Sequence, residues 1–198
     1  MKIAIHQPEH FPYLGFFYKM SQADLFVVLD DVQYKKNNFQ NRNWFFNTTR
    51  EKEWFTIELE PKPHRKDIKD VTVCKNKAWR SKILKKLRHN FKQDYGDIYD
   101  SDQLTEINLR SIKYSMKHLS IKTPLVLSSE MNITTSKTQR LVDICKGVGA
   151  TQYISGIGGK DYLELELFEK NNIELCFSEY SPINYCSAVY NIYHRIGI

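Results

Sequence analysis

Three short polar sequences in this 198-residue chain carry side chains that could do chemistry together. Each follows an apolar run: His6-Gln7-Pro8, Asp30-Asp31, and a glycine-rich stretch that begins at Ser155. Imidazole titrates near neutral pH, so His6 could act as a general acid or base, with the amide of Gln7 beside it. The carboxylate of Asp31 could bind an ammonium group, a ribose hydroxyl or Mg²⁺. His6, Gln7 and Asp31 are therefore the candidate catalytic residues.

The same residues also have structural interpretations, which the sequence leaves open. His6 could border or cap the core, and Asp30-Asp31 could form the turn that ends a strand. If that strand continued through both aspartates, they would point to opposite sides, and at most one would face a ligand. A metal site between His6 and His10 is disfavoured, because Pro8 prevents a helix from presenting both on one face.

Candidate binding residues gather in two further segments. The glycines from 156 to 159 would let backbone N–H groups approach an anion, and a helix predicted to begin near Asp161 would favour the same charge. A purely structural turn is an equal alternative, because the stretch is neither a Walker loop nor a G-x-G-x-x-G fingerprint. Amides between residues 33 and 43 suit sugar hydroxyls and Arg42 suits phosphate, unless this segment is a loop held by its own side chains. The candidate substrate- or nucleotide-binding residues are Tyr13, Lys19, Asp30, Gln33, Asn38, Gln40, Asn41, Arg42, Ser155, Gly156, Gly158, Gly159, Lys160 and Tyr162.

An α/β fold would bring these sequences to one edge of a parallel sheet. Continuous apolar runs predict strands at 3–6, 25–29, 125–127, 152–155 and 173–177. Helices are predicted at 15–23, from a capping box at 136–139 to a stop at Gly147, and at 162–171. The pattern predicts a Rossmann-like, three-layer parallel sheet. Ligands bind outside the carboxyl ends of such strands, so the three polar sequences form one site if their strands are neighbours.

A hairpin and a helical segment interrupt this pattern at about 44–120, inside what we expect to be a single domain over 1–198. Strands are predicted at 44–47, 53–60 and 71–73, and a second helix runs from 102 to 118. The first helix has one apolar stripe, formed by Trp79, Ile83, Leu84, Leu87 and Phe91. Residues 62–92 hold twelve Lys/Arg and two Asp, whereas the whole chain carries a net charge of +6. This segment suits a phosphorylated or polyanionic partner, or is a solvated basic face.

Composition excludes several other classes of protein. No apolar run approaches the roughly 20 residues of a membrane helix, and no signal-peptide pattern precedes His6. The four cysteines, at 74, 145, 176 and 186, form no C-x-x-C pair and no zinc pattern. We therefore expect a cytoplasmic protein without membrane insertion, disulfides or a structural metal.

The motifs named above resemble those of the WbqC-like family, found among bacterial polysaccharide and O-antigen biosynthesis functions. The matching segments are 3–8, 12–15 with Lys19, 24–34, 38–43, 140–146 and 153–163. The resemblance spans about residues 1–180, because Asn184 to Val189 and the tail to Ile198 depart from the family's closing pattern. It implies a role proposed for some members, the transfer of glycine to the amine of an amino sugar.

A second similarity, of architecture, is to nucleotidyltransferase-type domains such as pantothenate synthetase, which makes an amide with ATP. These resemblances imply a nucleotide-linked amino sugar, a small acyl or amino-acid donor, and ATP with Mg²⁺ as the cofactor to consider. Gln7, Asn38, Gln40 and Asn41 would then hold hydroxyl groups. Alternatives that stay open are a non-catalytic nucleotide- or sugar-binding module of polysaccharide assembly and, less favoured, tRNA binding through the basic helices.

Overall fold

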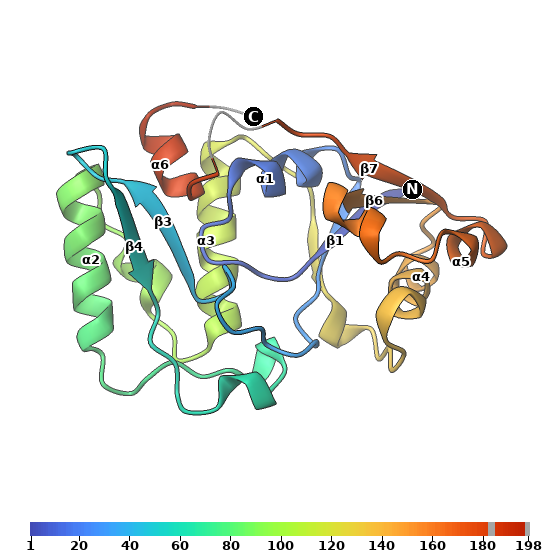
Figure 1. Cartoon of the computed structure of the whole chain (residues 1–198), viewed down its shortest axis with the longest axis horizontal. Coiled ribbons are helices and arrows are strands. Elements are labelled where there is room, and N and C mark those ends of the chain that lie inside the picture. The colour runs from blue at the N-terminus through green and yellow to red at the C-terminus, as the bar shows by residue number, and fades with distance from the viewer. Residues whose placement is uncertain (182–184, 197–198) are drawn as a thin grey trace. The chain divides into compact units, whose positions relative to one another are not determined.

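The structure, a computed structural model, describes residues 1–181 and 185–196 and divides the chain into two compact units (Figure 1). Unit 1 comprises Met1–Gln7, Gly15–Asp30 and Ile121–Pro182, and unit 2 comprises Pro8–Leu14, Asp31–Ser120 and Ile183–Ile198. The segment expected at 44–120 therefore lies within a larger unit, which has its own hydrophobic core. That the two units act as a single domain stays a prediction.

The centre of unit 1 is a five-stranded parallel sheet, as the continuous apolar runs predict. Its strands are β1 (Lys2–His6), β2 (Leu25–Val28), β5 (Leu125–Leu127), β6 (Gln152–Gly156) and β7 (Glu174–Ser178). The strand order is β5-β2-β1-β6-β7, so β1 lies between β2 and β6. Residues Ile3 to Ile5 are almost completely buried, because this central strand is covered on both faces.

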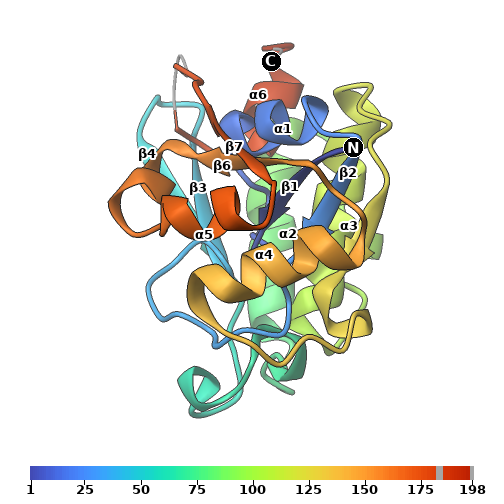
Figure 2. The ribbon, with the colours of Figure 1, turned by 90° about the vertical axis from the view of Figure 1, so that its right-hand side faces the viewer.

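Helices cover both faces of this sheet, which gives unit 1 three layers. The α4 helix (Lys137–Gly147) and the α5 helix (Leu165–Lys170) share a core cluster with Ile3 and Ile5. The α1 helix (Leu14–Ser21) packs on the opposite face, where the Phe16 ring lies 5.0 Å from the rings of His6 and Phe26. Figure 2 shows α4 and α5 in front of the strands. The alternation of side chains along β1 therefore directs His6 to the α1 face.

Three local predictions differ in part from the structure. The helix expected at 162–171 is present but shorter, as α5 (Leu165–Lys170). A 3₁₀ turn, η5 (Ile157–Asp161), precedes it, and the N–H groups of Tyr162 and Leu163 bond the Gly159 carbonyl there. The helix expected from 136–139 to Gly147 is confirmed as α4, but its capping box does not form, because Lys137 has φ of 55° and the Ser136 side chain makes no cap hydrogen bond. The expected strand at 71–73 consists only of isolated bridges.

Unit 2 combines a hairpin with two long helices. The hairpin pairs β3 (Arg42–Phe46) with β4 (Lys52–Thr56), and the long helices are α2 (Ala78–Phe91) and α3 (Leu104–His118). A short helix, α6 (Ala188–Tyr193), and three 3₁₀ turns complete it, at Pro63–Arg65, Ile68–Asp70 and Gly96–Tyr99. The predicted α2 stripe is confirmed, with four residues buried and Leu84 partly buried against the same core as Phe45 and Phe55.

Candidate functional site

The carboxyl ends of β2, β1 and β6 lie next to one another in unit 1. The chain passes from β1 to β2 on one side and, after β5, returns to β6 on the other side of β1. The direction of winding thus reverses between β1 and β6, which is where open α/β sheets bind ligands. The condition that the three strands be neighbours is met, and His6, Asp30 and the segment after Ser155 follow them.

His6 ends β1 as a neutral imidazole. Its Nδ1 lies 3.0 Å from the carbonyl oxygen of Gln7, which can only accept, so Nδ1 carries the proton and Nε2 is left as the acceptor nitrogen. Burial and the positive charge of Lys19 lower the pKa of His6 to about 3. At neutral pH this ring can accept a proton or a hydrogen bond at Nε2, but it has no proton there to donate.

Lys19 brings a buried ammonium group to the same end of β1. Its side chain extends from α1, and Nζ donates to the carbonyl of Ile5 at 3.1 Å. Nζ also lies 6.0 Å from the centre of the Phe26 ring. Buried lysines are uncommon unless their charge is used, so this ammonium is the strongest candidate in unit 1 for holding an anionic group.

The Asp30 side chain connects the ends of two strands, β2 and β5, by hydrogen bonds. Its carboxylate accepts hydrogen bonds from the Ser128 hydroxyl at 3.2 Å, from the Ser129 N–H at 3.0 Å and from the Ser129 hydroxyl at 2.8 Å. These serines directly follow β5, whereas β2 ends at Val28, so the expected alternation of Asp30 and Asp31 along a strand does not occur. Asp31 is half-buried and begins unit 2.

The glycines after Ser155 differ in their surroundings: Gly159 is closely packed, whereas Gly156 and Gly158 have space around them. A Cβ on Gly159 would lie 2.2 Å from Ser155 Oγ, whereas Gly156 and Gly158 have no atom within 4 Å of an added Cβ. Ser155 is itself buried, and its hydroxyl donates to the Gly156 carbonyl. The helix expected to begin near Asp161 starts instead at Leu165 and has only six residues, so it does not support an anion site; the predicted binding role of the glycine segment stays a prediction.

Two further candidates of unit 1 lie on the surface after β6. Lys160 is exposed, and its Nζ lies 5.2 Å from the centre of the Phe177 ring. Tyr162 is 69% exposed. Both side chains are accessible to a ligand, and their predicted binding role remains a prediction.

The candidate binding residues of unit 2 make hydrogen bonds with other residues of the same unit. Asn41 accepts from the Tyr34 hydroxyl and donates to the Ile57 carbonyl, and Gln40 is buried and accepts from the Lys35 N–H. These contacts favour the interpretation of a loop held by its own side chains. The remaining candidates also have internal contacts: Gln33 with His64, Asn38 with Phe39, Arg42 with Asn37, and Tyr13 in a bridge with Ser187.

Sequence reasoning missed Ser128 and Ser129, whose hydroxyl groups donate to the Asp30 carboxylate. They follow a predicted strand directly, so the rule applied to the other strand ends would have found them. Among residues 1–181 and 185–196, no group of three or more His, Cys, Asp or Glu is placed to hold a metal ion. The four cysteines are free, and none of the described helices is long and apolar enough to cross a membrane.

Unit 1 is thus a parallel α/β sheet with polar side chains at the strand ends where its winding reverses, which is where such sheets bind ligands. The model of the WbqC-like protein family matches residues 7–195, and the chain belongs to that family. The match extends beyond the 180 residues expected and includes α6; Asn184, where the departure was expected to begin, lies outside the described residues.

One curated protein is similar in sequence over most of its length. An uncharacterized protein of Mycobacterium tuberculosis, Rv1507c, is 27% identical over 191 residues, covering 90% of this chain and 82% of the relative. No solved structure matches the chain. The family is therefore shown by the family model, and neither comparison assigns a reaction.

Proposed function

We propose that this protein is an acyl- or aminoacyltransferase that places glycine, or a similar small acyl group, on the amine of a nucleotide-linked amino sugar. It would do so in the cytoplasm, on a Rossmann-like sheet, in the synthesis of bacterial surface polysaccharide such as O-antigen. Family membership supports the proposal through the glycine-transfer role that the resemblance implies. The site would be the strand-end edge of unit 1.

One observation carries the proposal: a neutral imidazole and a buried ammonium lie at the end of the central strand. His6 presents an unprotonated Nε2, while Lys19 donates to the carbonyl of the residue before it. Amide formation needs an acceptor for the proton of the attacking amine and a cation near the anionic leaving group. These two side chains are of those two types, and β1 and the α1 helix that packs on it hold them on the same face of the sheet in unit 1.

The proposed step transfers the acyl group from the donor oxygen to the amine nitrogen of the sugar. The amine nitrogen of the sugar attacks the acyl carbon and forms the C–N bond, and its proton passes to Nε2 of His6. The bond from the acyl carbon to the donor oxygen breaks, and that oxygen leaves on the ribose of a tRNA or on a nucleotide phosphate. His6 then gives the proton to the departing ribose oxygen, or to solvent when the leaving group is a phosphate. With ATP, the glycine carboxylate first attacks a phosphorus atom of ATP and releases pyrophosphate or ADP, which forms the acyl donor. Because Nε2 begins unprotonated, His6 acts as base or hydrogen-bond acceptor, and the alternative in which it polarises the acyl oxygen is disfavoured.

Mg²⁺ does not fit on Asp30. Its Oδ1 accepts from the Ser128 hydroxyl and the Ser129 N–H, and its Oδ2 accepts from the Ser129 hydroxyl, so three of the roughly four lone-pair positions of this buried carboxylate are already used. ATP therefore enters the proposal only as one of two donors to be tested, and no step depends on a metal held by this carboxylate.

The experiment is a transfer assay with the full chain. Purified protein is incubated with an amino-sugar nucleotide and either glycine with ATP and Mg²⁺ or glycyl-tRNA, and the sugar is followed by mass spectrometry. A mass gain of one glycyl unit is expected, and it should be lost in His6→Ala but kept in His118→Ala, a matched change on the exposed end of α3. Unmodified sugar with both donors would contradict the proposal.

A second candidate, a non-catalytic nucleotide- or sugar-binding module, is favoured by the low basicity of His6. A pKa near 3 leaves the ring a weak base in the free protein, although it remains a good hydrogen-bond acceptor. Calorimetry separates the two candidates. Binding of the nucleotide sugar without turnover in the parent protein indicates a module, whereas unchanged affinity with lost turnover in His6→Ala indicates an enzyme.

A further inference from the structure

The positive charge of the chain is concentrated in unit 2. Its sequence holds 21 Lys/Arg against 13 Asp/Glu, a net charge of +8, whereas unit 1 holds 8 against 10, a net charge of −2. A net charge of this size within one unit attracts anionic partners at long range. The proposed amide-forming site does not use it, because His6 and Lys19 belong to unit 1.

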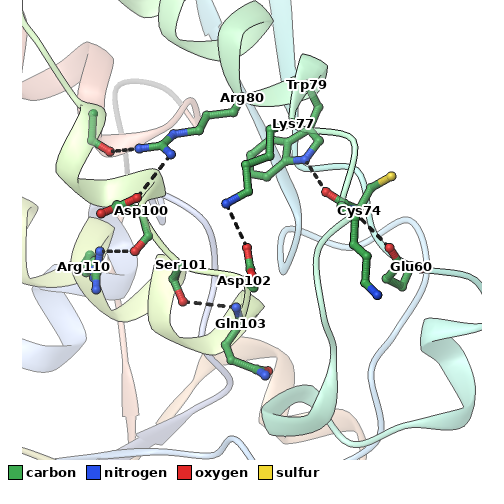
Figure 3. A network of polar contacts seen from close by, with 12 residues as sticks. Glu60, Cys74, Lys77, Trp79, Arg80, Asp100, Ser101, Asp102, Gln103 and Arg110 are labelled. Atoms are coloured by element: carbon green, nitrogen blue, oxygen red, sulfur yellow. Dashed lines mark hydrogen bonds and ion pairs between the residues drawn. The ribbon is translucent and has the colours of Figure 1, made fainter.

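At the N-terminal end of α2 the basic side chains are neutralised within the unit (Figure 3). Arg80 pairs with Asp100 at 3.2 Å, and Lys77 pairs with Asp102 at 3.2 Å. Arg110 from α3 bonds the backbone carbonyl of Asp100 in the same network. These cations join helices and turns to one another, so this end of α2 offers little free charge to a partner.

Further along α2, the basic side chains line an open groove of about 290 Å³. Its lining residues are Glu53, Lys82, Lys85, Lys86, His89 and Asn90. Glu53 is the one acid of that lining, and it pairs with Lys86 at 3.3 Å. Lys82 and Lys85 form no ion pair within the described part of the chain. The groove therefore suits a phosphate-bearing ligand.

The outer face of the hairpin carries two indole rings beside two cations. Trp44 on β3 lies directly opposite Trp54 on β4. The backbone carbonyl of Trp44 accepts from the Ser187 N–H, and that of Trp54 accepts from Lys86. Both carbonyls thus point away from the partner strand, so this is a non-hydrogen-bonded pair, in which side chains lie closest.

Cations lie over these rings at short distance, as cation–π contacts. Lys52 Nζ lies 4.2 Å from the centre of the Trp44 ring and 4.9 Å from that of Trp54, and the Arg42 guanidinium lies 4.8 Å from the centre of the Trp54 ring. Trp54 is 37% exposed, although a large apolar side chain is ordinarily buried. Rings held on a strand pair beside cations can stack on other rings while the cations contact anions.

Lys86 links the groove to the backbone of the strand that carries Trp54. Lys86 Nζ reaches from the groove to the carbonyl of Trp54 at 2.8 Å, so the basic side of α2 borders the open edge of β4. Both surfaces belong to unit 2, and one residue of α2 joins them. A ligand that carries phosphates and flat rings in alternation could contact both at once.

We infer that unit 2 binds a single-stranded nucleic acid, with phosphates along the α2 groove formed by Lys82, Lys85 and Lys86 and bases stacked on the Trp44–Trp54 face. The combination favours this ligand over others of the same charge. A polyphosphate would use the lysines without the rings, and a duplex would keep its bases stacked and out of reach of the indoles. The inference stands apart from the proposed transfer reaction, because its residues lie in unit 2.

The test uses the full chain and a labelled oligouridylate of about 12 nucleotides, within the usual site size for such surfaces. Fluorescence anisotropy across a series of salt concentrations gives the affinity and its salt slope. Binding should weaken as the salt concentration rises. It should also quench the emission of Trp44 and Trp54, while the emission of the buried Trp79 should remain. The variant Trp54→Ala should bind about tenfold more weakly, and Trp54→Phe, which keeps a ring, should lose less.

A pair of charge variants tests the groove without touching the core. Lys82→Gln with Lys85→Gln should lower the salt slope by about 1.4, since each phosphate contact on a single strand contributes about 0.7. Lys113→Gln with Lys117→Gln makes the same charge change on α3, outside the groove, and should leave the slope unchanged.

Several outcomes would overturn the inference. They are no binding of the oligouridylate at 50 mM salt, equal losses in both pairs of charge variants, and equal losses in Trp54→Ala and Trp54→Phe. Competition by inorganic polyphosphate of matched charge as strong as by unlabelled oligouridylate would show a polyanion surface without base stacking. Binding to anionic lipid vesicles but not to the oligonucleotide would show a membrane surface instead.

Discussion

Replacing Gly159 by alanine should destabilise unit 1, because the glycine is needed for close packing. The added Cβ would lie 2.2 Å from Ser155 Oγ, 3.2 Å from Ser155 Cβ and 2.9 Å from a terminal carbon of Leu163. The Leu163 methyl can move, but Ser155 has a short side chain on β6, inside the sheet. Its Cβ cannot retreat without moving the strand, so rotating Oγ away removes only part of the clash.

The magnitude follows from the cost of inserting one methyl group into a packed site. Overpacking of this kind costs roughly 1–3 kcal/mol of the free energy of unfolding. For a chain of this length, 1 kcal/mol lowers the melting temperature by about 2–4 °C. The melting temperature of unit 1 should therefore fall by about 2–12 °C. Gly158→Ala is the matched control, because no atom lies within 4 Å of its added Cβ and its φ is not positive.

The assay must observe unit 1 itself. The chain's three tryptophans, at 44, 54 and 79, all lie in unit 2, so their emission reports the unfolding of that unit. Far-UV circular dichroism includes the sheet and helices of unit 1. Thermal melts are followed by both signals. The melting temperature seen by circular dichroism should fall for Gly159→Ala and should not change for Gly158→Ala.

A double variant provides the refutation. Adding Ser155→Ala removes the oxygen at 2.2 Å, so it should restore part of the stability lost in Gly159→Ala. Equal melting temperatures for Gly158→Ala and Gly159→Ala, or no rescue by Ser155→Ala, would refute the packing argument. If both glycine variants instead kept their stability and lost ligand binding, the segment would serve the ligand rather than the fold.

Two further predictions concern buried polar groups. Asp30→Asn should lose about 1–3 kcal/mol of the free energy of unfolding in urea, since it disturbs three hydrogen bonds to a buried carboxylate; the exposed change Asp161→Asn should lose under about 0.5 kcal/mol. Burial lowers the pKa of His10 to about 3, so the unfolded chain binds more protons between pH 6.5 and 3. Stability should therefore fall with decreasing pH across that window, by up to about 1.4 kcal/mol per pH unit for this group, and less steeply in His10→Gln; identical acid profiles would contradict this.

Much of unit 1 was predictable because its signals are local. Apolar runs of strand length predicted every strand of the parallel sheet, to within one or two residues at their ends. The α2 stripe was predicted for the same reason, since the spacing of its apolar side chains is itself the helical repeat. The motif set also indicated the family that the family model shows.

The local predictions that failed concern residues whose partners are distant in sequence or whose backbone is unusual. The capping box at Ser136 fitted its motif, but the left-handed backbone at Lys137 prevents it. The helix expected at 162 is shortened because a 3₁₀ turn closes at Gly159, where packing on Ser155 admits only glycine. Neither the backbone conformation of Lys137 nor the packing of Gly159 can be inferred from the spacing of apolar residues.

By itself, the sequence determined the class of fold, the family and the positions at which polar residues follow strands. These follow from periodicity and motifs, which depend on neighbours along the chain. Only the tertiary structure decided the use of each side chain: Asp30 binds serines 98 and 99 residues away, Asn41 binds Tyr34 and Ile57, and His6 holds its proton on Nδ1. A hydrogen bond depends on distance and direction in space, and two residues far apart in sequence acquire these only when the strands that carry them have paired.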